Sequence, residues 1–206
     1  MTQEMAAGRT RAKLSVSDMI TVGVFSALYF CICGVAMLIV NLCFGLPGTI
    51  LLPAVTALLA GPVFMLLAAR VRRFGAITVM GVVLGFVLFL AGHFATSLVT
   101  AIVFPLLADC IAQVGRHRNR IALMASYAVF SFGCAGPIVP MWMMRGAYVA
   151  SLQRKGKDTA TIDAIMANVN GTSLVVVIVA TIACALVGGW LGLRMNRRHF
   201  AKAGVA

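Results

Sequence analysis

The chain has 206 residues, of which 62% are hydrophobic and only 11% are charged, and its formal net charge is +12. A water-soluble domain of this size needs far more polar surface, so the composition excludes one and indicates a membrane protein that crosses the bilayer several times. The positive excess does not indicate nucleic-acid binding, because Lys and Arg stand in clusters between apolar runs without interleaved aromatic residues.

The chain opens on a polar stretch, MTQEMAAGRTRAKLSVSD, that is too long for the start of a secretory signal peptide. We therefore expect residues 1–16 to form a cytoplasmic tail. The six cysteines form no CxxC pair and lie mostly in apolar runs. They are expected to be small core residues rather than disulfide or metal ligands.

The apolar runs that follow predict the fold, because a helix of about 20 mostly apolar residues crosses a bilayer. We expect six such helices, at Ser17–Val40, Thr49–Ala69, Ala76–His93, Thr96–Val114, Ile121–Met141 and Ser173–Leu193. The predicted fold is an all-α, six-transmembrane-helix bundle over residues 17–194, followed by a basic cytoplasmic tail at 195–206.

The distribution of cations predicts the orientation of this bundle. Most Lys and Arg residues fall on one side of the predicted helices, at Arg9, Arg11, Lys13, Arg70, Arg72, Arg73, Arg116, Arg118, Arg120, Arg194, Arg197, Arg198 and Lys202. The other side has Arg145, Arg154, Lys155 and Lys157, all in one connection. Positively charged loops favour the cytoplasm, so both termini are expected inside a bacterial plasma membrane.

The connection between the last two predicted helices, residues 145–172, is much longer than the other two on its side. A long loop among short ones is usually functional. Asp158 or Thr159 is expected to cap a short helix within it, with an apolar face made of Ile162, Ile165, Met166 and Val169. We expect this segment to lie on the membrane surface or across the mouth of the bundle.

Motifs for catalysis are missing from the sequence, which contains no GxxxxGK[ST], HExxH or GxSxG. The chain is therefore expected not to be an enzyme. Asp109 lies inside an apolar run, where a carboxylate indicates function by default. It either relays protons or forms an ion pair near the cytoplasmic side with Arg116, Arg120 or the cations at 70–73. Asp18 is expected to cap the first helix.

Candidate ligand-binding residues gather on the predicted outer side. Pro137 and Pro140 should break the fifth helix beside Arg145, which suits an anionic or polar ligand. The full candidate set is Asn41, His93, Trp142, Arg145, Asn168 and Asn170. Each has a simpler alternative: turn or cap duty for the amides, an interfacial aromatic belt for Trp142, and contact with lipid headgroups for His93 and Arg145.

Small residues recur at helical spacing on three of the predicted helices. Gly23 and Ala27 lie on one face of the first helix, and similar pairs occur at Gly81 and Gly85 and at Gly188 and Gly192. Such faces allow helices to approach closely, whether inside the bundle or at a partner.

Four segments together resemble the integral membrane family Trep_Strep, also described as MptD-like. They are KLSVSDMITVGVFSALYF, LADCIAQVGRHRNR, FSFGCAGPIVPMW and the final RRHFAKAGVA, and the resemblance covers residues 12–206. It implies a substrate-binding S component of an energy-coupling factor (ECF) transporter, a six-helix bundle that captures a vitamin or metal-related compound from outside. A membrane-embedded T component and two cytoplasmic ATPases complete such an importer.

The resemblance also implies that small residues on the first helix, commonly Ala-xxx-Ala, contact the T component. Here the matching positions are Gly23 and Ala27, so a glycine replaces the first alanine. No cofactor or metal is expected. Two alternatives stay open: a self-sufficient secondary transporter in which Asp109 carries protons, and a membrane scaffold or accessory protein without transport activity.

Overall fold

The computed structural model of the chain describes residues 14–202, with side chains through residue 196. Arg9, Arg11 and Lys13 of the expected N-terminal tail lie outside the described residues. The helices are α1 (Val16–Phe44), η1 (Leu46–Leu51), α2 (Leu52–Arg70), α3 (Ala76–Leu90), α4 (Ala95–Val114), α5 (Arg120–Ser131), η2 (Phe132–Ala135), α6 (Pro140–Met143), α7 (Arg145–Arg154), α8 (Thr159–Ala167) and α9 (Gly171–Lys202).

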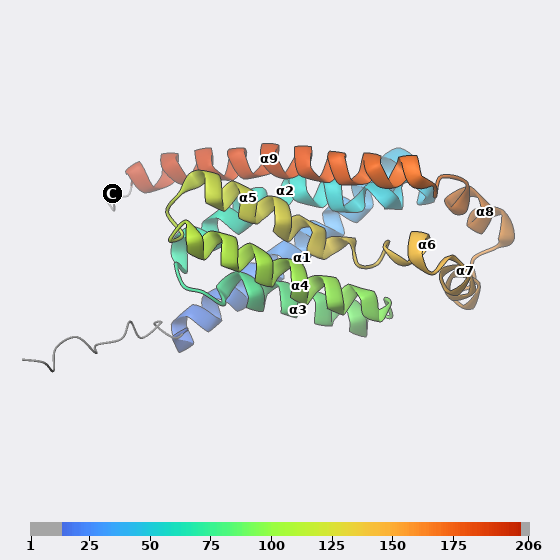
Figure 1. Ribbon diagram of the computed structural model, residues 1–206, viewed down its shortest axis with the longest axis horizontal. Helices are drawn as coiled ribbons and strands as arrows, with labels where there is room; N and C mark the ends of the chain where they lie inside the picture. The colour runs from blue at the N-terminus through green and yellow to red at the C-terminus, as the bar shows by residue number, and fades with distance from the viewer. Residues whose placement is uncertain (1–13, 203–206) are drawn as a thin grey trace, which may run out of the picture.

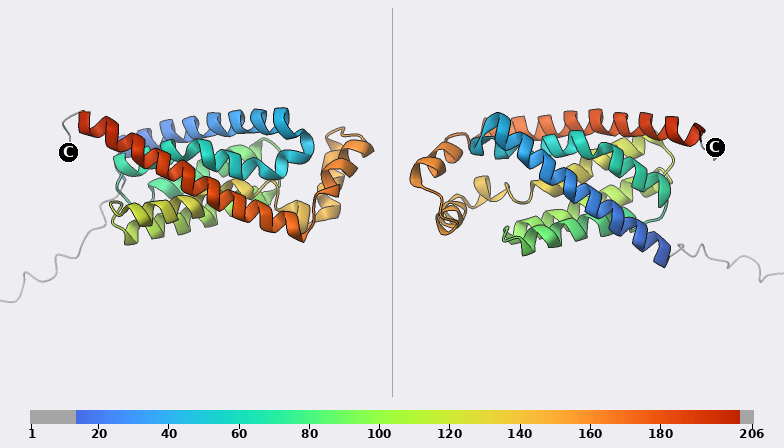
Figure 2. Two further views of the ribbon diagram at one scale, coloured as in Figure 1. Left: turned by 90° about the horizontal axis from the view of Figure 1, so that it is seen from above. Right: turned by 180° about the vertical axis from the view of Figure 1, so that it is seen from behind.

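The long helices lie side by side along one axis and alternate in direction, as Figures 1 and 2 show. The start of α1 and the end of α9 lie at the same end of the bundle, which we call the terminal end. The short helices α6, α7 and α8 gather at the opposite end, which we call the loop end. The α2–α3 and α4–α5 connections, which contain the arginine clusters, are at the terminal end.

Within residues 14–202, four segments are long and apolar enough to cross a membrane, by length and composition. They are Val16–Phe44, Leu46–Arg70, Ala95–Val114 and Gly171–Asn196. The other two predicted spans correspond to shorter apolar helices, Ala76–Leu90 and Arg120–Ala135. The all-helical prediction is confirmed, whereas two of the predicted spans are shorter than expected.

The fifth predicted helix ends earlier than Met141, for a reason visible in its sequence. Its α-helical part stops at Ser131 and continues as a 3₁₀ turn to Ala135, before Gly136 and two prolines. Proline removes a backbone donor and clashes with the preceding turn, so the helix cannot continue. The Thr96 hydroxyl donates to the Gly136 carbonyl at 3.0 Å, which fixes the broken stretch against α4.

The first helix begins with the cap expected from Asp18. The Ser15 backbone N–H donates to the Asp18 carboxylate at 2.8 Å, and the Asp18 N–H donates back to the Ser15 hydroxyl at 3.2 Å. This reciprocal pair satisfies amides that a helix start otherwise leaves unpaired. Asp18 also forms an ion pair with Arg73 at 2.8 Å, which joins α1 to the α2–α3 connection.

The centre of the bundle is aromatic and closely packed. The centroid of the Phe64 ring lies 4.9 Å from that of Tyr127 and 5.0 Å from that of Phe130, and Tyr29 meets Phe130 edge-on. The buried Tyr127 hydroxyl donates to the Ala57 carbonyl at 2.6 Å, so its polar atom is satisfied.

At the loop end, α8 forms where the sequence indicates it. Asp158 caps it by accepting from the Thr161 N–H at 3.2 Å, and Ile162, Ile165, Met166 and Val169 are buried together against Ile138 and Met141. The helix α7 was not predicted. The last helix also differs from the prediction, because α9 continues to Lys202 rather than ending near Leu193. Much of the expected basic tail is therefore helical.

Candidate ligand site at the loop end

The turn between α3 and α4 fixes the position of His93. Gly92 has a φ of +81°, a left-handed conformation that glycine adopts without strain. The His93 N–H then donates to the Leu88 carbonyl at 3.2 Å, and the ring Nδ1 lies 3.0 Å from the same oxygen. Because a carbonyl only accepts, Nδ1 must carry a proton, which leaves Nε2 for another partner.

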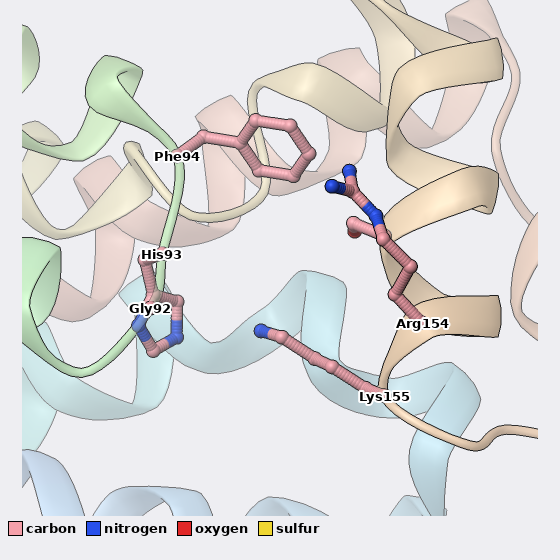
Figure 3. A pocket seen from close by; sticks show the side chains of 6 residues that line it. Gly92, His93, Phe94, Arg154 and Lys155 are labelled. Carbon is pink, nitrogen blue, oxygen red and sulfur yellow. The ribbon is translucent and has the colours of Figure 1, made fainter.

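A cleft of about 330 Å³ separates this turn from the end of α7. We call it the mouth cleft, and it is lined by Gly92, His93, Phe94, Ser151, Arg154 and Lys155. Figure 3 shows the Arg154 and Lys155 side chains extending across it toward Phe94 and His93. Phe94 stacks on Tyr148 of α7 with ring centroids 6.1 Å apart, which holds the two walls together.

The mouth cleft is lined by two cationic side chains, Arg154 and Lys155. No carboxylate is among its lining residues, and within the described part of the chain neither Arg154 nor Lys155 forms an ion pair. Arg154 donates through Nε to the Ala150 carbonyl of its own helix at 3.4 Å, so its terminal nitrogens stay available. Such a cleft attracts anions.

A second cavity, of about 210 Å³, lies between α1, α2, α3 and η2 and is open on the α1 side, where Phe30, Gly34 and Met37 are exposed. We call it the inner cavity, and it is lined by Phe30, Cys33, Gly34, Met37, Leu52, Thr56, Leu84, Leu88, His93, Cys134 and Pro137. His93 lines both this cavity and the mouth cleft. It is therefore the residue that the two spaces share.

The inner cavity is mostly apolar, with few polar atoms on its wall. The Thr56 side chain is 1% exposed, and its hydroxyl has no hydrogen-bond partner among the described residues. The Cys33 thiol lies near this hydroxyl but without hydrogen-bond geometry. A buried hydroxyl without a partner is uncommon and is explained most simply by a bound molecule or water.

Of the six predicted ligand residues, the structure brings one, His93, to these spaces. Trp142 instead donates through Nε1 to the Asn170 carbonyl at 2.9 Å, and the Asn170 side chain caps α9 by accepting from the Ser173 N–H. Trp142 also lines a separate apolar groove of about 400 Å³ between α4 and α9.

The remaining candidates also have local contacts. Arg145 donates to the Met166 carbonyl at 3.5 Å and so joins α7 to α8, while Asn168 is exposed and donates within α8. The Asn41 Oδ1 atom is buried without a hydrogen-bond partner, but Asn41 lines neither the mouth cleft nor the inner cavity. Of these contacts, the Asn170 cap corresponds to one of the alternatives given above, whereas the Arg145 contact with a backbone carbonyl and the unpaired Asn41 oxygen do not.

Sequence reasoning missed the residues on the α7 wall. Arg154 and Lys155 were counted as loop cations, and Ser151 was not considered. The sequence does contain a signal for this wall. If the segment is helical, Tyr148, Ser151 and Lys155 lie on one face, because they follow one another at spacings of three and four.

The small-residue pairs divide into two kinds. An added Cβ at Gly192 would come within 2.7 Å of the Gly61 carbonyl oxygen, and the buried Gly81 and Gly85 face α4, so these pairs serve packing inside the bundle. Gly23 and Ala27 are exposed on α1, and an added Cβ at Gly23 would meet nothing within 4 Å. The pair on α1 is therefore a flat part of the outer surface of the bundle.

Asp109 lies at the terminal end and is completely buried. Its Oδ2 accepts hydrogen bonds from the Gly75 N–H at 2.7 Å, the Thr78 N–H at 3.1 Å and the Thr78 hydroxyl at 2.9 Å. The expected ion pairs with Arg116 and Arg120 are not formed, because the carboxylate instead caps the first turn of α3. Among the described residues, no group of three His, Cys, Asp or Glu side chains is placed to hold a metal ion.

Comparison with protein families assigns the chain to a known family. The sequence model of the family described as "Hypothetical bacterial integral membrane protein (Trep_Strep)" matches residues 16–202. The chain belongs to this family. No curated protein and no solved structure matches it. Membership of Trep_Strep agrees with the apolar helices and supports a bacterial protein that crosses the membrane several times, and the family description names no activity.

Proposed function

We propose that this Trep_Strep protein is the substrate-binding S component of an ECF importer. In this role it captures a small micronutrient at the outer face of the plasma membrane and delivers it with a T component and two cytoplasmic ATPases. The observation that carries the proposal is the mouth cleft, which shares His93 with the inner cavity. This arrangement suits a molecule that enters from one end of the bundle.

The proposed orientation follows from the arginine clusters. Arg70–Arg73, Arg116–Arg120 and Arg194 belong to the terminal end, and clusters of this kind favour the cytoplasm. The loop end, with the mouth cleft, then faces outward. Six crossings are part of the proposal, although α3, with 15 residues, is about 22 Å long and therefore shorter than the hydrocarbon core. The turn that follows α3 and the neighbouring long helices would complete that crossing.

The proposed coupling surface is the flat part of α1 at Gly23 and Ala27. Because other glycine pairs are filled by neighbouring helices and this one is not, it is free to meet a helix of the T component. An outside partner is needed because ligand release inside requires differential affinity in two states, and ATP hydrolysis by the partner supplies the work.

Reconstitution tests this proposal. The affinity-tagged protein should co-purify from its native membrane with a small membrane protein and an ATPase pair. Proteoliposomes with this complex should take up the ligand that co-purifies with the protein only when ATP is present inside. Uptake by the protein alone, driven by a pH gradient and abolished by a protonophore, would instead establish a secondary transporter. An ATPase-free complex without uptake would favour a scaffold.

A further inference from the structure

The two spaces that share His93 differ sharply in chemistry, and this difference specifies a class of ligand. On one side the mouth cleft presents the Arg154 guanidinium and the Lys155 ammonium without an opposing carboxylate. Figure 3 shows the guanidinium directed toward Phe94 and the ammonium directed toward His93. A carboxylate or phosphate placed among them would accept charge-assisted hydrogen bonds from two cations.

On the other side, the inner cavity offers apolar contact. Phe30, Met37, Leu52, Leu84 and Leu88 supply most of its wall, together with the Cys33 and Cys134 side chains. Transfer of a hydrocarbon group from water into such a cavity strengthens binding by about fourfold for each CH₂. A fully hydrophilic anion would leave this space without matching contacts.

Resting on the proposed function, we propose that the ligand is an amphipathic anion. Its carboxylate or phosphate lies in the mouth cleft between Arg154, Lys155 and His93, and its compact apolar body enters the inner cavity. The buried Thr56 hydroxyl offers one hydrogen bond to a polar atom within that body. The ligand comes from solution, because both cations lie at the loop end rather than among the lipid-facing helices.

Octanoate, acetate and 1-octanol are suitable probes, because they separate the charge from the chain. Their binding to the purified protein in phosphatidylcholine nanodiscs is measured by calorimetry, with empty nanodiscs subtracted for partition into lipid. Octanoate is expected to bind at least about tenfold more tightly than either acetate or 1-octanol, since only octanoate uses both spaces. Equal affinity for octanoate and either of the other probes would overturn the proposal.

Two variants assign the ends of the bound molecule. Arg154→Gln combined with Lys155→Gln should weaken octanoate binding about tenfold and leave 1-octanol unchanged. Gly34→Leu should weaken octanoate but not acetate, because the new side chain fills the inner cavity from a position where an added Cβ meets nothing within 4 Å. Arg118→Gln, at the other end of the bundle, is the matched charge control. Unchanged octanoate binding in the double variant would refute the assigned headgroup site.

Nanodiscs that contain phosphatidylglycerol test the source of the anion. Octanoate affinity that stays unchanged supports a dissolved ligand, whereas competition by the lipid would overturn that part of the proposal in favour of a lipid headgroup. These binding measurements need neither ATPase nor T component. A preference for octanoate without ATP-driven uptake would therefore contradict the proposed importer function but not the inference about the ligand. ATP-driven uptake of a ligand that lacks an anionic group would contradict this inference alone.

Discussion

His117 Nε2 lies 3.7 Å from Asp109 Oδ1 at the terminal end, and their side chains are 2% and 0% exposed. Neither of these two atoms has a hydrogen-bond partner among the described residues, whereas Asp109 Oδ2 accepts three hydrogen bonds at the start of α3. The two side chains therefore link α3, α4 and the α4–α5 turn within a space closed to water. This arrangement favours a structural role for Asp109 over a path for protons through the membrane.

The variant Asp109→Asn tests this role. An amide oxygen can still accept from the Gly75 and Thr78 amides, but the negative charge at the helix start is lost. We expect a loss of about 1–2 kcal/mol in the free energy of unfolding. Thermal unfolding in detergent measures this loss, and ATP-driven uptake should persist below the new transition. Normal stability together with abolished uptake would indicate a proton relay instead.

The α4–α5 turn contains two residues with left-handed backbone, Arg116 with φ 51° and His117 with φ 53°. A residue with a side chain is strained by about 1–2 kcal/mol in this backbone conformation. Because Arg116 is exposed, contacts of its side chain offset little of this strain. Arg116→Gly is expected to be neutral or to stabilise the protein by up to about 1 kcal/mol.

Arg118→Gly is the matched control for that variant. Arg118 is also exposed in the same turn but does not have a positive φ. Its replacement should therefore lower the unfolding temperature. Equal loss of stability in the two variants would contradict the strain argument.

Local sequence features predicted much of this fold. Hydropathy placed the long helices, Asp18 marked the start of α1, and Asp158 marked the start of α8. Pro137 and Pro140 indicated the break after α5. Each of these depends on residues close in the sequence, because caps, turns and helix breaks are local effects.

The candidate site was harder to predict because its contacts join distant segments. Asp109 bonds to residues 31 and 34 positions away, so no spacing in the sequence reveals that it caps α3 rather than pairing with nearby arginines. Arg145 and Arg154 look alike as loop cations. The fold of α7 decides which of them lines the mouth cleft.

Acid should loosen the cap of α8. The Thr161 hydroxyl and then the Thr161 N–H donate to Asp158 and lower the pKa of its carboxyl below the usual 3.8. Because the folded pKa is the lower one, the stabilisation is complete above about pH 4 and is lost as the pH falls through the folded value. The protection of α8 amides, measured against the intrinsic exchange rate at the same pH, should therefore fall in that range for the native protein. Asp158→Ala should show this lower protection already at pH 7, and an unchanged pattern would contradict the cap.

The glycine pairs should respond in opposite ways to bulky substitution. At Gly192 an added Cβ would meet the Gly61 carbonyl oxygen at 2.7 Å, so Gly192→Leu should destabilise the protein by about 1–3 kcal/mol or more through overpacking.

Gly23→Leu and Ala27→Leu should leave both the unfolding temperature and ligand affinity unchanged, because both positions are exposed on α1. Under the importer proposal these two variants nevertheless abolish ATP-driven uptake, since the new side chains hold the T component away from α1. Ala183→Leu, equally exposed but on α9, is the matched control and should transport normally. Normal uptake by both α1 variants would remove the assignment of Gly23 and Ala27 to the coupling surface.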